Sequence, residues 1–225
     1  MEWHPYLLKL LSGAAMTLQL TGTAVVLASC LALPLALVRA YARPAWQWPL
    51  RLYISFFRGT PLLAQLFLLY YGSGQFRPEL QQLGLWGFFR DPFNCAVLAF
   101  TLNSTAYQIE ILRGGLQAVP RGEIEAGLAY GMRWSLLLRR IILPHAYRIA
   151  WPALGNEIIL LLKASAIASV VTLLDVMGQT RRLFASSFDL SVYLWAGLAY
   201  LLITYAFIWL WQRFEKRLSR HRPPV

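Results

Sequence analysis

Four long stretches of this sequence contain no acidic, basic or histidine side chain, and they restrict the chain to a membrane-embedded fold. They are Leu10–Val38 with 29 residues, Leu190–Gln212 with 23, and Gly59–Phe76 and Pro92–Ile109 with 18 each. About 20 consecutive apolar residues allow a helix to cross the hydrocarbon core of a bilayer. The stretches therefore predict four transmembrane helices, at about residues 12–38, 53–72, 92–112 and 190–212.

A fifth apolar stretch, His145–Val171, predicts a less regular membrane helix because it contains ionisable side chains. Arg148, Glu157 and Lys163 fall within it, and a charge near the bilayer centre costs roughly 2.5–3.5 kcal/mol on insertion scales, so such groups seldom face lipid. We expect a span over about residues 146–170, helical to about residue 162 and then kinked or partly re-entrant. The five spans together predict an all-α membrane protein with a single transmembrane domain over residues 1–225.

The distribution of positive charge predicts the orientation of the chain. Charged residues make up only 14% of the sequence, and the net charge is +11. In the five-span arrangement, 15 of the 21 Lys and Arg residues lie on one side of the membrane. Because Lys and Arg concentrate in cytoplasmic loops, we expect the N-terminus outside and the C-terminus in the cytoplasm. Arg181 and Arg182 are the exception, and the basic excess indicates topology rather than binding of nucleic acid.

No catalytic, metal-binding or nucleotide-binding pattern is present in the sequence. His4, His145 and His221 are isolated from one another, and there is no H-E-x-x-H pair or nucleophile elbow. No glycine precedes a lysine, so the G-x-x-x-x-G-K-[ST] phosphate-binding loop is missing. Cys30 and Cys95 are expected near opposite faces of the membrane, too far apart for a disulfide. We expect no catalytic residue, no metal site and no bound cofactor.

The connection over about residues 118–144 is too charged to insert into the membrane and too regular to be only a linker. Pro120 suits the first turn of a helix, and Glu123 complements the positive end of that helix. Gly131 is expected to interrupt it, and a second helix begins near Arg133 and stops before Pro144. Two interpretations remain open for this elbow. It either lies on lipid headgroups or provides a docking element for a cytoplasmic partner.

The spacing within "EAGLAYGMRWSLLLRRIILP", residues 125–144, resembles the EAA loop of ABC importer permeases. That pattern is E-A-A, three residues, G, nine residues, and I-x-L-P. The matching positions are Glu125, Ala126, Gly131, Ile141, Leu143 and Pro144. Gly127 departs from the pattern by replacing the second alanine. The resemblance implies that Glu125 and Gly131 position the elbow, with Ile124 and Leu128 supplying apolar contact to an ATPase.

Longer stretches resemble one branch of these permeases, the transporters of polar amino acids. They include residues 57–72, 102–126 and 155–175, within a likeness that covers about residues 15–215. Within this branch, the sequence is most similar to permeases for histidine, arginine, other basic amino acids and opines. The resemblance implies a type I ABC importer fold with two permease subunits, two separate ATPase subunits that bind ATP, and an extracytoplasmic substrate-binding protein. The helix over about Pro120–Tyr130 would sit in a groove of the ATPase.

Polar side chains within the expected spans are the candidates for a substrate pathway, because each needs a partner in the bundle or a wet cavity. They are Gln65, Asn103, Ser104, Tyr107, Asn156 and Glu157. For each one, hydrogen bonding between helices is the alternative. Glu157 is the foremost candidate, since a buried carboxylate demands a cation. That cation is a basic substrate, Arg148, Lys163 or a residue of a partner permease. Glu110 is expected to pair with Arg113 or another arginine.

Together with the resemblance, these observations predict a permease subunit of an ATP-driven importer for polar, and within that class basic, amino acids, located in the bacterial inner membrane. A permease for neutral or acidic polar amino acids is the alternative within transport. From a different class, a passive channel or scaffold would use the elbow only as a brace on the lipid surface. Coupling to ATP distinguishes a permease from a passive channel or scaffold, because a channel conducts without nucleotide.

Overall fold

The computed structural model describes residues 4–218, with side chains from residue 6 to residue 217, and every regular element in that range is a helix. The α-helices are α1 (His4–Tyr41), α2 (Pro44–Gly59), α3 (Leu62–Ser73), α4 (Arg77–Gln82), α5 (Trp86–Phe89), α6 (Pro92–Gln117), α7 (Arg121–Ala129), α8 (Trp134–Leu137), α9 (Leu143–Ala164), α10 (Val176–Ser187) and α11 (Ser191–Leu218). The all-α fold predicted from the sequence is confirmed. The side chains of His4 and His221 lie outside the described residues.

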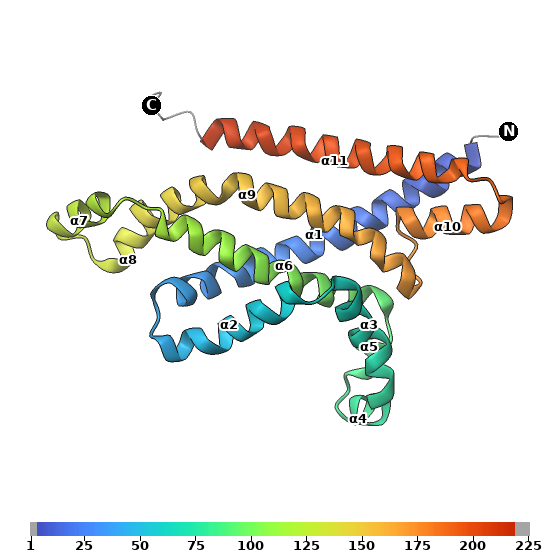
Figure 1. Ribbon diagram of the computed structural model, residues 1–225, viewed down its shortest axis with the longest axis horizontal. Coiled ribbons are helices and arrows are strands. Elements are labelled where there is room, and N and C mark those ends of the chain that lie inside the picture. The colour runs from blue at the N-terminus through green and yellow to red at the C-terminus, as the bar shows by residue number, and fades with distance from the viewer. Residues whose placement is uncertain (1–3, 219–225) are drawn as a thin grey trace.

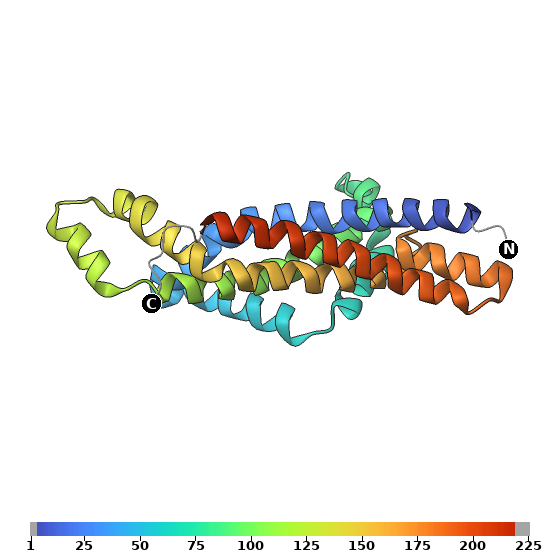
Figure 2. The same ribbon diagram turned by 90° about the horizontal axis from the view of Figure 1, so that it is seen from above.

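Four long helices, α1, α6, α9 and α11, run lengthwise through an elongated bundle (Figures 1 and 2). The α7–α8 elbow forms one end of the molecule, and α10 with the start of α1 forms the other. Helix α6 is central, since it packs against α1, α2, α3 and α9. Helices α4 and α5 extend sideways from the bundle beyond α3 (Figure 1).

Three helical segments among the described residues are long and apolar enough to cross a membrane, namely Tyr6–Tyr41, Trp134–Val171 and Ser191–Arg217. Pro44–Gly59 and Leu62–Gln82 meet the same criterion together, but the chain bends by 101° between them. The expected span at residues 53–72 is therefore not one straight helix. Pro61 explains the break, because proline disfavours helical backbone at the residue before it, and Thr60 is extended with φ −115° and ψ 147°.

Helix α6 coincides with the span expected at residues 92–112, but it is not among the segments that qualify by hydropathy. Its 26 residues reach about 39 Å at 1.5 Å per residue, which is long enough to cross a bilayer. Its low hydropathy comes from polar side chains that are buried inside the bundle: Thr101, Asn103, Ser104, Thr105 and Gln108. The five-span topology remains a prediction, and length and composition alone give three spans, or four with the bent pair.

The second half of the elbow does not stop before Pro144, as the sequence suggested, but continues into α9. Between α8 and α9 the chain forms a π-helical turn over Leu138–Ile142, in which the Leu143 N–H donates to the carbonyl of Leu138. Proline lacks an N–H and clashes with the carbonyl four residues earlier, and a π-turn is a known way for a helix to absorb such a local misfit. The elbow is therefore joined to α9 by helical backbone.

The far end of α9 agrees with the kinked continuation expected after residue 162. A 3-10 segment, Ser165–Val171, follows Ala164 and ends at Thr172, whose φ of 70° is left-handed. Asp175 then caps α10, accepting a hydrogen bond from the Gly178 N–H at 2.8 Å. The chain turns at this point without leaving the end of the bundle (Figure 1).

Helix α11 docks on α9 where Gly155 leaves room for an aromatic side chain. The Trp211 ring stacks on Trp151, with centroids 4.2 Å apart and planes 11° from parallel, and its indole N–H donates to the Trp151 carbonyl at 3.2 Å. A methyl group on Gly155 would overlap the Trp211 indole. Small residues allow such close approach between membrane helices, so Gly155 fixes the position of α11 on α9.

Replacing Gly155 with alanine should lower the melting temperature of the purified protein, because overpacking a tight contact costs about 1–3 kcal/mol. Gly197→Ala is the matched control, since Gly197 also lies in a helix and nothing lies within 4 Å of the added methyl group. Alanine favours a helix over glycine by up to about 1 kcal/mol, so this control should keep or raise the melting temperature. A melting temperature for Gly155→Ala equal to that of the control would contradict the assigned contact.

Candidate functional site

The elbow consists of α7, a tight turn and α8, as the sequence predicted. The turn is at Gly131, whose φ of 76° is left-handed and favours glycine. The Gly131 N–H donates to the Leu128 carbonyl at 2.9 Å, and the Met132 N–H donates to the Gly127 carbonyl at 3.1 Å. These bonds satisfy carbonyls at the end of α7, in the manner of a glycine helix stop. Arg133 then precedes α8 with extended backbone.

The two faces of α7 have different surroundings. Ile124 packs toward the bundle against the core cluster that includes Leu137 and Ile142, and Gly127 is buried. Glu125, Ala126 and Leu128 are exposed, and 51% of the Leu128 surface is accessible. The apolar pair expected to face an ATPase is therefore divided, because Ile124 belongs to the core and Leu128 points outward.

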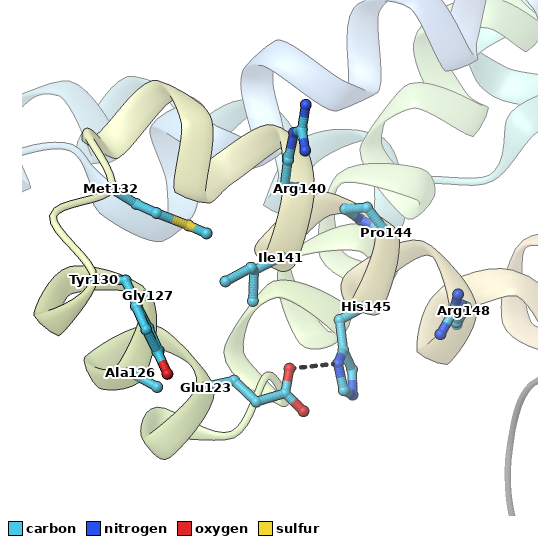
Figure 3. Close-up of a pocket in the computed structure, with 10 residues that line it drawn as sticks. All are labelled: Glu123, Ala126, Gly127, Tyr130, Met132, Arg140, Ile141, Pro144, His145 and Arg148. Carbon is cyan, nitrogen blue, oxygen red and sulfur yellow. Dashed lines mark hydrogen bonds and ion pairs between the residues drawn. The ribbon is translucent and has the colours of Figure 1, made fainter.

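A cavity of about 480 Å³ separates α7 from the start of α9 (Figure 3). Its lining includes Glu123, Tyr130, Arg140, Pro144 and Arg148, together with His145. The Nδ1 atom of His145 lies 3.0 Å from the Glu123 Oε2 atom, as the dashed line in Figure 3 marks. In the sequence His145 is isolated from the other histidines, but folding brings it to an acidic side chain 22 residues away.

Gly127, which replaces the second alanine of the EAA pattern, is where α7 rests on the second half of the elbow. A methyl group there would lie 2.5 Å from the Leu137 Cδ1 atom and 3.0 Å from the Ile141 Cδ1 atom. Leu137 is fully buried, so its side chain cannot swing into open space. The departure from the pattern is therefore matched by Leu137 and Ile141, which occupy the volume that an alanine would need.

The expected pathway residues gather around a second cavity, of about 290 Å³, between the α2–α3 break, α6 and α9. Asn103, Tyr107 and Glu157 line it, together with Thr60 and Leu160. Asn103 and Tyr107 share one face of α6, as their four-residue spacing predicted. Gln65 and Ser104 lie behind the wall, each bonded to a lining residue. Asn156 is exposed and does not line this cavity.

Gln65 and Asn103 complete the backbone hydrogen bonding where α2 and α3 separate. The Gln65 Nε2 atom donates to the carbonyls of Phe57 at 3.0 Å and Thr60 at 3.1 Å. The Asn103 Nδ2 atom donates to the Phe57 carbonyl and to Gln65 Oε1, both at 3.0 Å. Backbone carbonyls released by a helix break must find donors within a membrane protein. These two side chains therefore bind the helices together, which is the structural alternative raised for them.

Glu157 is 7% exposed, and its carboxylate accepts a hydrogen bond from a chain of hydroxyl and amide groups on α6. The Ser104 hydroxyl donates to Glu157 Oε1 at 3.0 Å, and Gln108 donates to Ser104 at 3.2 Å. Neither Arg148 nor Lys163 forms an ion pair with Glu157, and no described residue does. The carboxylate therefore has hydrogen-bond donors on one side and a cavity on the other.

Arg58 is a residue of this region that the sequence interpretation missed. Its guanidinium carbon lies 5.1 Å from the centroid of the Tyr107 ring, which lines the cavity. Arg58 precedes Gly59, Thr60 and Pro61, so it stands at the end of α2 where the chain bends. The glycine and proline after a basic residue inside an apolar stretch were the available signal, because they predict a helix break.

Glu110 pairs with arginines at the elbow end of α6, as expected. It contacts Arg113, with Oε2 2.6 Å from Nη2, and Arg39 of α1, with Oε1 3.3 Å from Nε. Among the described residues, no group of three or more His, Cys, Asp or Glu side chains is arranged to hold a metal ion. Cys30 and Cys95 are free thiols, the first exposed and the second buried.

Gly127→Ala should displace α7 from its seat, because the added methyl group overlaps Leu137. We expect less of the ATPase subunit that the resemblance implies to co-purify with this variant than with the wild type. Shortening the obstructing side chain in the double variant Gly127→Ala/Leu137→Val should recover part of the loss. Gly122→Ala, on the same helix with nothing within 4 Å of the new methyl group, is the control. Equal co-purification of all four proteins would show that the Gly127 contact does not position α7.

Known proteins resemble this chain over nearly its whole length. The family model described as "Binding-protein-dependent transport system inner membrane component" matches residues 14–220. The nopaline transport system permease protein NocM of Agrobacterium fabrum is 41% identical over 88% of this chain and 82% of its own length. The histidine/lysine/arginine/ornithine transport system permease protein HisM of Escherichia coli is 42% identical over 95% of this chain and 90% of its own length.

Solved structures share the fold. The crystal structure of an amino acid ABC transporter with histidines has a chain that superposes with a TM-score of 0.81 at 36% identity, covering 95% of both chains. A chain of the MetNI methionine ABC transporter, only 18% identical, superposes with a TM-score of 0.78 and shares the architecture alone. Taken with the family match, these similarities identify the chain as a member of the family of inner membrane components of binding-protein-dependent transport systems.

Proposed function

We propose that this chain is the permease subunit of an ATP-driven importer for basic amino acids or the opines derived from them. The exposed face of α7 carries the proposal, because Glu125, Ala126 and Leu128 are exposed on a short helix that lies at one end of the molecule (Figure 1). A helix that served only as a connection would not need this outward face. The names of the relatives NocM and HisM support the substrate class.

The energy for transport comes from a separate subunit in this proposal. This chain contains no phosphate-binding loop of the G-x-x-x-x-G-K-[ST] type, so ATP is bound and hydrolysed by partner ATPase subunits and the permease itself is not an enzyme. The α7–α8 elbow lies in the cytoplasm, and the N-terminus lies outside. Fifteen of the 21 Lys and Arg residues are then on the cytoplasmic side, in agreement with the positive-inside rule.

A second permease subunit covers the outward face of α9. This face carries Ile149, Ala153, Asn156, Leu160 and Lys163, all of them exposed and three or four residues apart. An amide and an ammonium group at membrane depth are costly against lipid, whereas a neighbouring subunit or a wet pathway can pair with them. The second subunit is either another copy of this chain or a related permease, and an extracytoplasmic binding protein delivers the substrate.

Glu157 provides the counter-charge for a basic substrate in this proposal. Its carboxylate borders the cavity lined by Asn103 and Tyr107 and lacks an ion-pair partner among the described residues. Ser104 fixes the carboxylate by donating to one of its oxygens. Arg58, stacked over Tyr107, is the nearby cation that a positively charged substrate would displace or avoid.

Two other functions make different predictions. A permease for neutral or acidic polar amino acids would keep its transport rate when the Glu157 charge is removed. A passive channel or scaffold would conduct without nucleotide, and changes to the elbow would leave its flux intact. The exposed apolar and acidic face of α7 favours a coupled transporter over a passive channel or scaffold. The carboxylate of Glu157 at the cavity favours a basic substrate over a neutral or acidic one.

Changes at Glu125 or Gly131 should abolish uptake while the permease still reaches the membrane. Glu125→Lys reverses the charge of the exposed face, and Gly131→Ala costs about 1–2 kcal/mol because the position is left-handed. Uptake of labelled arginine and membrane abundance by immunoblot are the measurements. Glu79→Lys, an exposed acid on α4, is the control. Normal uptake by both elbow variants would exclude the docking role.

Glu157→Gln should raise the KM for basic substrates at least about tenfold, equivalent to about 1.4 kcal/mol. The amide keeps an oxygen that accepts from Ser104 but loses the negative charge, so assembly with the ATPase should be unchanged. Uptake of arginine in proteoliposomes, measured as a function of substrate concentration, provides the KM. Glu79→Gln is the matched control. An unchanged KM for arginine would remove Glu157 from the pathway.

A further inference from the structure

Two arginines that line the cavity between α7 and α9 have no partner in the described part of the chain. Arg140 and Arg148 are exposed, and neither forms an ion pair or a cation–π contact with another described residue. Glu123 is the acidic side chain of the lining, and its Oε2 atom lies 3.0 Å from His145 Nδ1. The cavity therefore presents two unpaired guanidinium groups, while the acid beside them is already engaged.

Aromatic side chains place this cavity at the level of the lipid headgroups. Trp151 follows Arg148 by three residues, or about 4.5 Å along α9, and it stacks on Trp211 of α11. Arg213 lies two residues after Trp211, with its guanidinium carbon 4.0 Å from the centroid of the Trp209 ring. Tryptophans gather at membrane–water interfaces, and basic residues anchor helix ends there. Arg148 and Arg213 both follow this order, so the cavity meets the membrane surface.

The unpaired arginine of α9 points toward α11 rather than toward the face assigned to the second permease. Arg148 and Ile149 are consecutive, so their side chains point about 100° apart around the helix. Trp151, which contacts α11, is only about 60° from Arg148 but about 160° from Ile149. A lipid that lies along α11 can therefore reach Arg148 while the second permease covers Ile149.

The chemistry of the lining suits a phosphate group. A guanidinium group binds phosphate through parallel N–H donors, and Tyr130 contributes a phenol to the same lining. The volume of about 480 Å³ is within the range of small-ligand pockets. Basic pockets between membrane helices on the cytoplasmic side hold anionic lipid headgroups. An acidic protein surface would meet the same arginines, but the position of Arg148 beside Trp151 favours a lipid.

We propose that this cavity binds the phosphate of an anionic phospholipid, with Arg140 and Arg148 as its ligands and the acyl chains directed along the Trp151–Trp211 stack. The inference goes beyond the proposed function. It requires only that this end of the molecule lies at a membrane surface, so it stands or fails independently of the transported substrate.

The first test measures phospholipid binding by native mass spectrometry, on the complex purified in detergent with its accompanying subunits. The wild type should bind added phosphatidylglycerol more tightly than phosphatidylcholine, because only the former has a net negative charge. Arg140→Gln/Arg148→Gln should lower the affinity for phosphatidylglycerol at least about tenfold and leave that for phosphatidylcholine unchanged. Equal affinities of the wild type for the two lipids would overturn the proposal.

The matched control is Arg133→Gln/Arg139→Gln, which removes the same charge from exposed positions of the elbow outside the lining. This control should keep the wild-type affinity for phosphatidylglycerol. An equal loss of affinity in both double variants would indicate a diffuse effect of charge and would exclude a defined site.

Two other occupants of the cavity give different results. Inorganic phosphate should displace phosphatidylglycerol no better than chloride does at the same ionic strength, and stronger displacement by phosphate would identify a soluble anion as the ligand. If Arg140→Gln/Arg148→Gln instead loses a partner subunit and keeps its phosphatidylglycerol, an acidic protein surface occupies the cavity. Either result overturns the assignment to a lipid.

The second test locates the lipid in a bilayer. Phosphatidylglycerol with a photoreactive group near the headgroup end of an acyl chain should label the peptide that contains Trp151 several-fold more than the same probe made from phosphatidylcholine. This preference should disappear in Arg140→Gln/Arg148→Gln and persist in the control variant. Equal labelling of the wild type by the two probes would refute the site without reference to any variant.

Discussion

Backbone groups at membrane depth need internal hydrogen-bond partners, and the unusual features of this bundle arise where that requirement is hardest to meet. Between α2 and α3 the helix is broken by Pro61, which frees the carbonyls of Phe57 and Thr60. Gln65 and Asn103 supply the missing donors. The same break opens the cavity that Glu157 borders, because Thr60 and Pro61 form part of its wall. One irregularity thus requires polar side chains and makes room beside them.

Helix α6 holds these polar groups in place because it is covered by other helices over most of its length. Its buried amides and hydroxyls connect three elements, since Asn103 bonds toward α2 and α3 while Ser104 bonds to α9. At its elbow end, Glu110 draws Arg39 of α1 and Arg113 together. A helix of low hydropathy is stable at the centre because most of its buried polar side chains, Thr101 excepted, meet hydrogen-bond partners rather than lipid.

Local signals allowed much of this fold to be predicted, and side-chain register limited the rest. Gly131 predicted the turn of the elbow because a backbone position with left-handed φ favours glycine. The neighbours Asn156 and Glu157 looked alike as candidates, but successive residues on a helix point about 100° apart, so one faces outward and the other the cavity. His145 could not be assigned to Glu123 from spacing, since their contact depends on how the elbow folds back.

Helix α11 is attached to the remainder of the chain at few points. Only 11% of its most apolar stretch is buried within this chain, against 44% for the segment that contains α9. Trp211 rests on Gly155, and the Tyr200 hydroxyl donates to Asp175. Natural variation along this helix should therefore be uneven. Leucine, isoleucine, valine and phenylalanine can replace one another freely over most of it during evolution, while the tryptophan, the tyrosine and the glycine opposite can change only together with their partners.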